Sequence, residues 1–270
     1  MTSDQVKEVT TKLLEQFRNP EDLPEKLAFL YINMGRWSAR WSAGNQLIAM
    51  IYEASDAATY KTWGNLGRQV NKGAESFSIL KPLKRSYTTT DDDGKEVRRS
   101  YIYGFGGHNV FRLEDTKITD QEVWDKFADN KKAKEFMSEA EEFFAPVLTK
   151  LELKSFEASN TQGSGAAAWY SHKGSITMGV ESLQVTAHEL VHAIEHKLGN
   201  LTIAPGQQPD NELVAELGSA VMLNLMGHED KVDLGFTYEY LTNYANGKDL
   251  TKTCLSLLYR VDAAMKFALV

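Results

Sequence analysis

Apolar residues in the first half of the chain follow a helical spacing at first and a strand-like spacing later. They recur every three to four residues, the spacing of one buried helix face, over residues 6–17, 24–33 and 43–52. Runs rich in β-branched and aromatic residues then predict strands at residues 76–81, 87–90, 96–103 and 109–113. Asp91-Asp-Asp-Gly94 has the composition of a hairpin turn, and Pro82 is expected to end the strand before it. Between helices and strands, the glycine-rich residues 63–73 predict a short helix and a loop.

The second half alternates between helices and short strands. A long helical tract covers residues 122–151, and the alternation over 151–156 predicts a strand. Two short strands, 168–170 and 175–178, are expected to pair across a turn at His172-Lys-Gly174. Residues 166–170 and 176–178 are candidate edges to which an extended peptide could add, and an ordinary internal sheet is the alternative. Further helices are predicted at residues 183–198, 210–227, 237–244 and 250–267.

These elements predict an α+β fold of two domains. Residues 1–115 combine helices with a small antiparallel sheet, residues 115–120 form a linker, and residues 116–270 form the second domain. No run of 18 apolar residues occurs, and the N-terminus lacks an apolar segment, so we expect neither a membrane helix nor a signal peptide. The single cysteine, Cys254, permits no internal disulfide. We therefore expect a cytoplasmic protein.

A short motif in the second half carries the strongest chemical signal. His188-Glu189-Leu190-Val191-His192 is an H-E-x-x-H pattern within a predicted helix that Gly199-Asn200 ends. Residues four apart point the same way on a helix, so both histidines can reach one metal ion. Neutral imidazoles hold Zn²⁺ and leave a position for water, which the metal acidifies. Glu189 is the predicted catalytic general base.

The third metal ligand is expected from the helix that follows. Asp210 or Asn211 can N-cap this helix, and Glu212 and Glu216 lie four residues apart on one of its faces. The 20 residues from His192 to Glu212 allow one helix to end and a second to return alongside it. We assign Glu212 as the ligand and expect Glu216 to accept a hydrogen bond from a ligand histidine. The reverse assignment and a pair of solvated glutamates are the alternatives.

Three further residues of this region are considered for the chemistry. His196 could be mistaken for a ligand, but a metzincin needs its third histidine six residues after His192, where Leu198 stands. We interpret His196 as a residue at the rim of the site. Tyr170 and His228 are candidates for stabilising an oxyanion. The motif does not identify the ion, so Zn²⁺, Mn²⁺ and other divalent metals remain alternatives.

Charge and aromatic residues distinguish the first half from the second. The formal net charge is −7; residues 1–115 carry 16 basic and 15 acidic residues, whereas residues 116–270 carry 14 and 22. Aromatic rings interleave with basic residues in the window 36–85, a mixture that suits single-stranded nucleic acid because rings stack on unpaired bases and cations contact phosphates. The candidates are Arg36, Trp37, Arg40, Trp41, Lys61, Trp63, Arg68 and Lys72. The alternative is that the rings form a core and the charges a solvated face.

Several stretches together resemble one family. Trp37-Ser-Ala-Arg-Trp-Ser-Ala-Gly-Asn-Gln-Leu-Ile48, Trp63-Gly-Asn-Leu-Gly-Arg-Gln-Val-Asn-Lys-Gly-Ala-Glu75 and Asn109-Val-Phe-Arg-Leu-Glu-Asp115 resemble the N-terminal domain of ArdC-type antirestriction proteins. Ala168-Trp-Tyr170, the H-E-x-x-H motif and Glu212-Leu-Val-Ala-Glu216 resemble that family's metallopeptidase domain. The chain departs from the family pattern at Ala74, at Gly179, where proline is usual, and at Arg112-Leu-Glu-Asp115.

This resemblance implies a single-stranded-DNA-binding domain followed by a gluzincin-like (zincin-fold) zinc metallopeptidase domain. It also implies a mobile-element protein that counters restriction. We therefore expect a DNA-binding zinc hydrolase whose partners are single-stranded DNA, duplex DNA as a second option, and a peptide or protein substrate, without a membrane. Two alternatives remain: a non-catalytic protein that protects DNA and carries a structural zinc, and an intracellular zinc peptidase whose first domain binds a protein.

Overall fold

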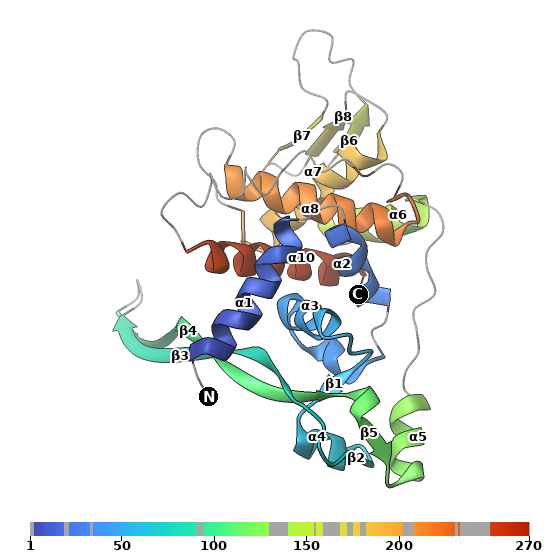
Figure 1. Cartoon of the computed structure of the whole chain (residues 1–270). Helices are drawn as coiled ribbons and strands as arrows, with labels where there is room; N and C mark the ends of the chain where they lie inside the picture. Colours follow the sequence, from blue (N-terminus) through green and yellow to red (C-terminus); the bar gives the residue numbers. More distant parts are fainter. Residues whose placement is uncertain are drawn as a thin grey trace. The chain divides into compact units, whose positions relative to one another are not determined.

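The computed structural model separates into two compact units (Figure 1). The first comprises Met1–Leu13, Arg36–Arg40 and Asn45–Lys131, and the second comprises Leu14–Gly35, Trp41–Gly44 and Lys132–Val270. This division differs from the expected boundary after residue 115, because residues 116–131 group with the first unit. The structure describes residues 3–18, 22–32, 35–90, 94–129, 140–153, 155–158, 168–171, 175–178, 182–201, 208–229, 232 and 249–269.

The helices of the N-terminal half match the apolar spacing. They are α1 (Ser3–Arg18), α2 (Leu23–Ile32), the 3-10 helix η2 (Trp37–Arg40), α3 (Ala43–Ile51) and α4 (Tyr60–Asn65). The carboxylate of Asp56, which is buried, organises the start of η2. It accepts hydrogen bonds from the backbone N–H groups of Trp37 (2.7 Å), Ser38 (2.9 Å) and Ala57 (2.8 Å). Backbone donors that would otherwise lack partners at the helix start are satisfied in this way.

One long hairpin replaces the several short strands expected between residues 76 and 113. Strand β3 (Phe77–Thr90) pairs with β4 (Glu96–Arg112) in an antiparallel ladder, and β1 (Ala57–Ala58) pairs with the far end of β4. Pro82 does not end β3, contrary to expectation; it stands opposite Phe105, next to a register shift between Leu83 and Lys84. A proline is tolerated beside such an irregularity because the ladder is already interrupted there.

The predicted linker is a strand. Residues Thr116–Ile118 form β5, which pairs with β2 (Arg68–Val70), part of the stretch expected to be a loop. The left-handed Gly67 precedes β2, and a Cβ there would clash with the carbonyl oxygen of Asp120. The helix α5 (Gln121–Asp129) follows and packs Trp124 and Phe127 against the first unit's buried cluster of Ala58, Trp63, Leu66 and Val70.

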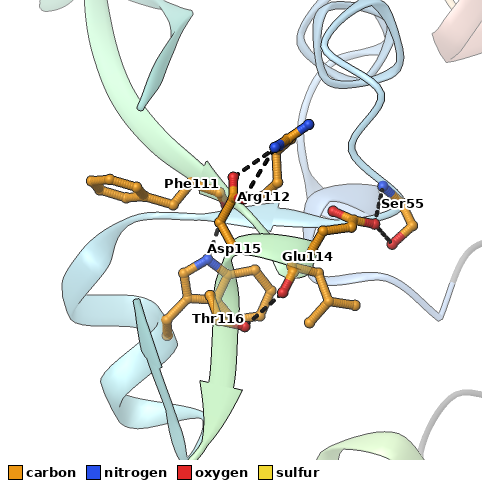
Figure 2. Close-up of polar contacts among 8 residues, drawn as sticks. Ser55, Phe111, Arg112, Glu114, Asp115 and Thr116 are labelled. Carbon is orange, nitrogen blue, oxygen red and sulfur yellow. Dashed lines mark hydrogen bonds and ion pairs between the residues drawn. The ribbon is translucent and has the colours of Figure 1, made fainter. Parts of the chain in front are cut away.

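A short 3-10 turn, η3 (Leu113–Asp115), joins β4 to β5 (Figure 2). Arg112 donates two hydrogen bonds to the carboxylate of Asp115, at 2.8 and 3.0 Å. Glu114 accepts hydrogen bonds from the backbone N–H and the hydroxyl of Ser55, and the hydroxyl of Thr116 donates to the carbonyl of Leu113 at 2.7 Å. Arg112 and Asp115 therefore satisfy each other within this turn, whereas Glu114 has Ser55, outside the turn, as its partner.

The second unit contains a small mixed sheet and the helices that carry the metal motif. Strand β8 (Ser175–Met178) is central, with β6 (Ser155–Ala158) parallel on one side and β7 (Ala168–Ser171) antiparallel on the other. The expected pairing of 168–170 with 175–178 is confirmed, and of these two strands β7 is the edge. The expected strand over 151–156 begins only at Ser155, because α6 (Ala140–Leu151) extends to Leu151.

Three long helices complete the second unit: α7 (Leu183–Lys197), α8 (Pro209–Leu225) and α10 (Leu250–Leu269). Figure 1 shows α7 next to the sheet and α8 next to α7. The predicted turn at 172–174 and the predicted helix at 237–244 lie outside the described residues. Among the described residues, no helix combines the length and apolar content that crossing a bilayer requires.

Candidate metal centre

The helix α7 presents the H-E-x-x-H motif from a well-defined start to a well-defined end. The hydroxyl of Ser182 caps its N-terminus by accepting from the N–H of Val185 at 3.4 Å. Gly199, at φ +71°, follows its C-terminus in the left-handed conformation that glycine favours. Ala187, Leu190, Val191 and Ile194 are buried on the packed side, while His188 and His192 are only partly buried. The apolar face of α7 thus leaves both histidines free to meet a partner from α8.

The helix α8 starts at Pro209 and brings Glu212 into its first turn. The sequence suggested Asp210 or Asn211 as the N-cap, but Gln208 occupies that position. Pro209 is then the first helical residue, and the φ of proline is already suited to a helix. Gly218 lets α8 approach α7 closely, because a Cβ at this position would lie 3.0 Å from Cγ2 of Val191. The close approach of the two helices brings the motif and Glu212 together.

Three side chains converge at this point. The Nε2 atoms of His188 and His192 lie 3.1 Å apart, and Oε2 of Glu212 lies 3.4 Å from the first and 3.7 Å from the second. Two nitrogen ligands of one tetrahedral Zn²⁺ are about 3.3 Å apart, given Zn–N bonds of about 2.0–2.1 Å. The spacing therefore fits a divalent ion. Among the described residues, the group of potential ligands comprises these three and does not include Glu216.

The charge of Glu212 suits metal binding. Hydrogen bonds from His188 and His192 lower the pKa of Glu212 to about 2, so this carboxylate is ionised at neutral pH. Ionised carboxylates and neutral imidazoles are the forms that bind metal. Glu212 therefore already carries the negative charge that attracts a cation, and an Nε2 atom that donates to it would give up that proton on binding the metal.

Glu189 has a different environment from Glu212, although both lie near the two histidines. Its side chain is buried, and this burial raises its pKa, while the nearby His192 and His188 oppose the increase. The backbone N–H of Tyr170, in the edge strand β7, donates a hydrogen bond to its carboxylate. A carboxylate with a raised pKa is better suited to take up and release a proton near neutral pH than a solvated one.

Tyr170 and His196 form a pair near Glu189. The Tyr170 hydroxyl and Nδ1 of His196 are 2.8 Å apart, and burial raises the pKa of the tyrosine. His196, predicted at the rim of the site, is partly buried and engaged by Tyr170. His228 follows α8, and its backbone N–H donates to the carbonyl of Leu223 at 2.9 Å.

An ionic network that the motif did not reveal holds the two ligand-bearing helices together. Nε of Arg260, in α10, donates a hydrogen bond to the buried carboxylate of Glu195 in α7. Its Nη1 and Nη2 donate to Asp210 (3.3 Å) and Asn211 (2.8 Å) in the first turn of α8, directly before Glu212. The one hint in the sequence was Glu195, an acidic residue beside the buried Ile194 in an apolar stretch of α7.

Trp63 is a core residue, which corrects its assignment as a nucleic-acid contact. Its ring is completely buried, and its indole N–H donates to the carbonyl of Phe111 at 2.9 Å. Trp37 is partly buried against the same cluster, and the exposed guanidinium of Arg40 covers its ring at 4.0 Å. A ring that is enclosed in a core cannot stack on a base, because both faces already have partners.

The remaining predicted contacts in the first half differ in exposure. Arg68 donates to Thr116 at 2.7 Å and lies 4.4 Å from the ring of Trp124, so its guanidinium joins β2 to β5 and α5. Lys61 and Lys72 are exposed. Arg36 is partly buried and donates to Gln46 at 3.3 Å, and Trp41, which falls in the second unit, is also partly buried.

Comparison with solved structures identifies the fold. No family model matches the chain, and the search of curated proteins gives no match. The metal-free crystal structure of the antirestriction protein ArdC from plasmid R388 is similar, with a TM-score of 0.52 and 16% identity over 97% of this chain and 96% of that one. The Mn(II)-bound structure of the same protein gives 0.44 and 17% over 83% and 85%. The chain therefore has the α+β fold of the ArdC antirestriction protein, as its sequence motifs suggested.

Proposed function

We propose that this chain is a metal-dependent peptidase that also binds DNA and acts against restriction. The peptidase part depends on one observation: His188, His192 and Glu212 present three ligand atoms to one point, next to the buried carboxylate of Glu189. We propose Zn²⁺ as the ion and Mn²⁺ as the alternative. When bound, the ion would supply an acidified water and polarise a substrate carbonyl.

The chain's own residues account for the proton transfers. Glu189 takes the proton of the attacking water and later gives it to the leaving amine, a role that suits its raised pKa. The backbone N–H of Tyr170 keeps the carboxylate of Glu189 oriented. Tyr170 belongs to the edge strand β7, along which an extended peptide can add as a further strand. The substrate we propose is therefore an extended segment of a protein. Glu216, one turn after Glu212, would support a ligand histidine.

The antirestriction part depends on the fold shared with ArdC, whose name records that activity. We propose that the first unit binds single-stranded DNA, with duplex DNA as a weaker ligand, and that the protein works in the cytoplasm of a cell that receives a mobile element. The exposed cations Arg40, Lys61 and Lys72 support this proposal because they can contact phosphates.

The variant Glu189→Gln tests the peptidase. It should keep the bound metal, measured by elemental analysis, and lower the cleavage of a peptide mixture, followed by mass spectrometry, by about 10²–10⁴-fold. The exposed Glu229, just beyond α8, offers a matched control: Glu229→Gln should change neither quantity. Cleavage that persists in metal-loaded Glu189→Gln would rule out Glu189 as the base.

The same variant separates the two parts of the proposal. If Glu189→Gln protects unmethylated DNA from a restriction endonuclease as well as the unmodified protein does, protection does not need proteolysis and the metal has a structural role in it. If protection is lost while DNA binding remains, proteolysis is part of the antirestriction activity. Absence of any DNA binding would leave a peptidase whose first unit binds a protein.

A further inference from the structure

The outer half of the β3–β4 hairpin exposes three tyrosines. Residues 84–88 and 98–103 are exposed on both faces of the ribbon, and the fractional exposures of Tyr87, Tyr101 and Tyr103 are 47%, 46% and 52%. A two-stranded ribbon without a core behind either face gains little stability from large aromatic side chains. These rings therefore need an explanation other than core packing.

The strand register places the three rings on one face. Arg85 stands opposite Tyr101 and Tyr87 opposite Arg99, and directly opposed residues of an antiparallel pair share a face. Tyr103, two residues after Tyr101, lies on the same face, as the guanidinium of Arg85 5.3 Å from its ring shows. Tyr87 and Tyr101 meet edge to face at 6.0 Å. We call these residues the tyrosine face: Arg85, Tyr87, Arg99, Tyr101 and Tyr103.

The ribbon carries an excess of cations. Residues 81–103 contain six cations and four carboxylates: Glu96 in β4, and Asp91, Asp92 and Asp93, which lie outside the described residues. The tyrosine face itself holds two arginines and no acidic residue. Such a surface complements a polyanion, and the alternation of flat rings with cations complements a chain that carries both phosphates and planar bases.

We infer that the tyrosine face binds single-stranded nucleic acid, with the rings stacking on unpaired bases and Arg85 and Arg99 contacting phosphates. This inference deepens the DNA-binding part of the proposed function and depends on it. It replaces Trp63, which is buried, and Arg68, which joins β2 to β5 and α5, as the predicted nucleic-acid contacts. The ribbon instead presents both aromatic rings and cations to solvent. A duplex offers no free base faces to the tyrosine rings, because its bases are already stacked on each other.

The opposite face of the ribbon supplies a matched control. Lys84 and Arg98 lie on the same two strands as Arg85 and Arg99 but at positions that point the other way, and all four are exposed. Arg85→Ala with Arg99→Ala and Lys84→Ala with Arg98→Ala therefore remove the same charge from opposite faces. For the rings, Tyr87→Ala and Tyr101→Ala remove stacking, whereas Tyr87→Phe and Tyr101→Phe keep it.

The experiment measures fluorescence anisotropy of a labelled oligothymidylate, the matching oligouridylate and a duplex at two salt concentrations. We expect the full-length protein to bind the single strands more tightly than the duplex, and the comparison of DNA with RNA to show which nucleic acid is preferred. Each tyrosine-to-alanine change should weaken binding about tenfold, and the phenylalanine variants should retain it. The double variant Arg85→Ala with Arg99→Ala should bind more weakly than the double variant Lys84→Ala with Arg98→Ala.

Three results would overturn the inference, and only one of them also contradicts the proposed DNA binding. The two double variants, at Arg85 and Arg99 and at Lys84 and Arg98, could lose the same affinity while the tyrosine variants keep theirs. The electrostatic attraction would then be spread over the whole ribbon, and DNA binding by the first unit would still stand. A preference for duplex would contradict base stacking on the tyrosine face. No binding of any oligonucleotide would contradict both this inference and the proposed DNA binding. Peptide cleavage is unaffected in every case, because the motif helices belong to the second unit.

Discussion

Cys254 is the single cysteine of the chain and is completely buried in α10. Burial raises the pKa of its thiol from 9.0 to about 12, so the folded protein keeps the thiol protonated at pH values where the unfolded chain ionises. A group with a raised pKa contributes fully below the unfolded value and loses its contribution as pH rises towards the folded value. The free energy of unfolding should therefore fall between about pH 9 and about pH 12.

The variant Cys254→Ala isolates this effect. It lacks the thiol, so its free energy of unfolding, measured by urea denaturation at several pH values from 9 upward, should fall less steeply than that of the unmodified protein. The phenol of Tyr31, whose pKa burial also raises, contributes equally to both proteins and cancels in the difference. Parallel curves for the two proteins would show that the thiol is solvated in the fold.

The packing of α7 against α8 depends on the absence of a side chain at Gly218. A Cβ at this position would lie 3.0 and 3.2 Å from the two methyl carbons of Val191, which lies between the two histidines of the motif and is itself buried. We expect Gly218→Ala to lower the free energy of unfolding by about 1–3 kcal/mol, because a well-packed core resists added volume. Metal affinity should fall as well, since the shift separates Glu212 from the histidines.

Gly64 in α4 is the matched control for this substitution. It is also a helical glycine, but a Cβ there meets nothing within 4 Å. Gly64→Ala should leave the stability unchanged or raise it by up to about 1 kcal/mol, because alanine favours the helix and restricts the unfolded chain. Equal effects of the two substitutions, measured by denaturant unfolding, would contradict the close approach of α7 and α8.

The buried ion pair between Arg260 and Glu195 joins α10 to α7 at the level of whole elements. Removing only the cation, as in Arg260→Met, leaves a buried carboxylate without its charge partner and should cost about 3–5 kcal/mol of unfolding free energy. Adding Glu195→Gln to Arg260→Met should restore part of this loss, because the uncompensated charge disappears. The exposed pair of Lys197 and Glu152 is the comparison: Lys197→Met should cost at most about 1 kcal/mol. A double variant no more stable than Arg260→Met would mean that lost packing, not charge, sets the cost.

At the scale of the whole molecule, the sequence predicts what neighbouring residues determine and misses what distant ones determine. The motif helix, its end at Gly199 and the geometry of His188 and His192 follow from spacing along one helix. The pairing of β2 with β5 joins segments almost 50 residues apart, and neither strand is long enough to show alternation. Arg260 meets Glu195 across 65 residues, a contact that no local pattern encodes. Trp63 illustrates the same limit, because the spacing of a tryptophan among cations does not say whether the fold buries it.

Metal binding should stabilise the two units of the molecule to different extents. An ion that binds only the folded state raises stability by about 2.7 kcal/mol at a hundredfold excess over its dissociation constant. The three ligand side chains all lie in the second unit. Adding Zn²⁺ or Mn²⁺ should therefore raise the thermal transition of the protein and slow amide hydrogen exchange in α7 and α8, while the exchange of β2 and β5 in the first unit changes little. A chelator should reverse both effects.

The histidines of the chain provide the test of where the ion binds. His188→Ala removes a ligand atom and should abolish the metal-induced shift, whereas His108→Ala removes an exposed imidazole from β4 and should preserve it. Comparing the two variants separates the predicted centre from adventitious binding to surface histidines, because each loses one imidazole. If metal slows exchange equally in both units, or if the shift persists in His188→Ala, the ion is held elsewhere and the assignment of His188, His192 and Glu212 is wrong.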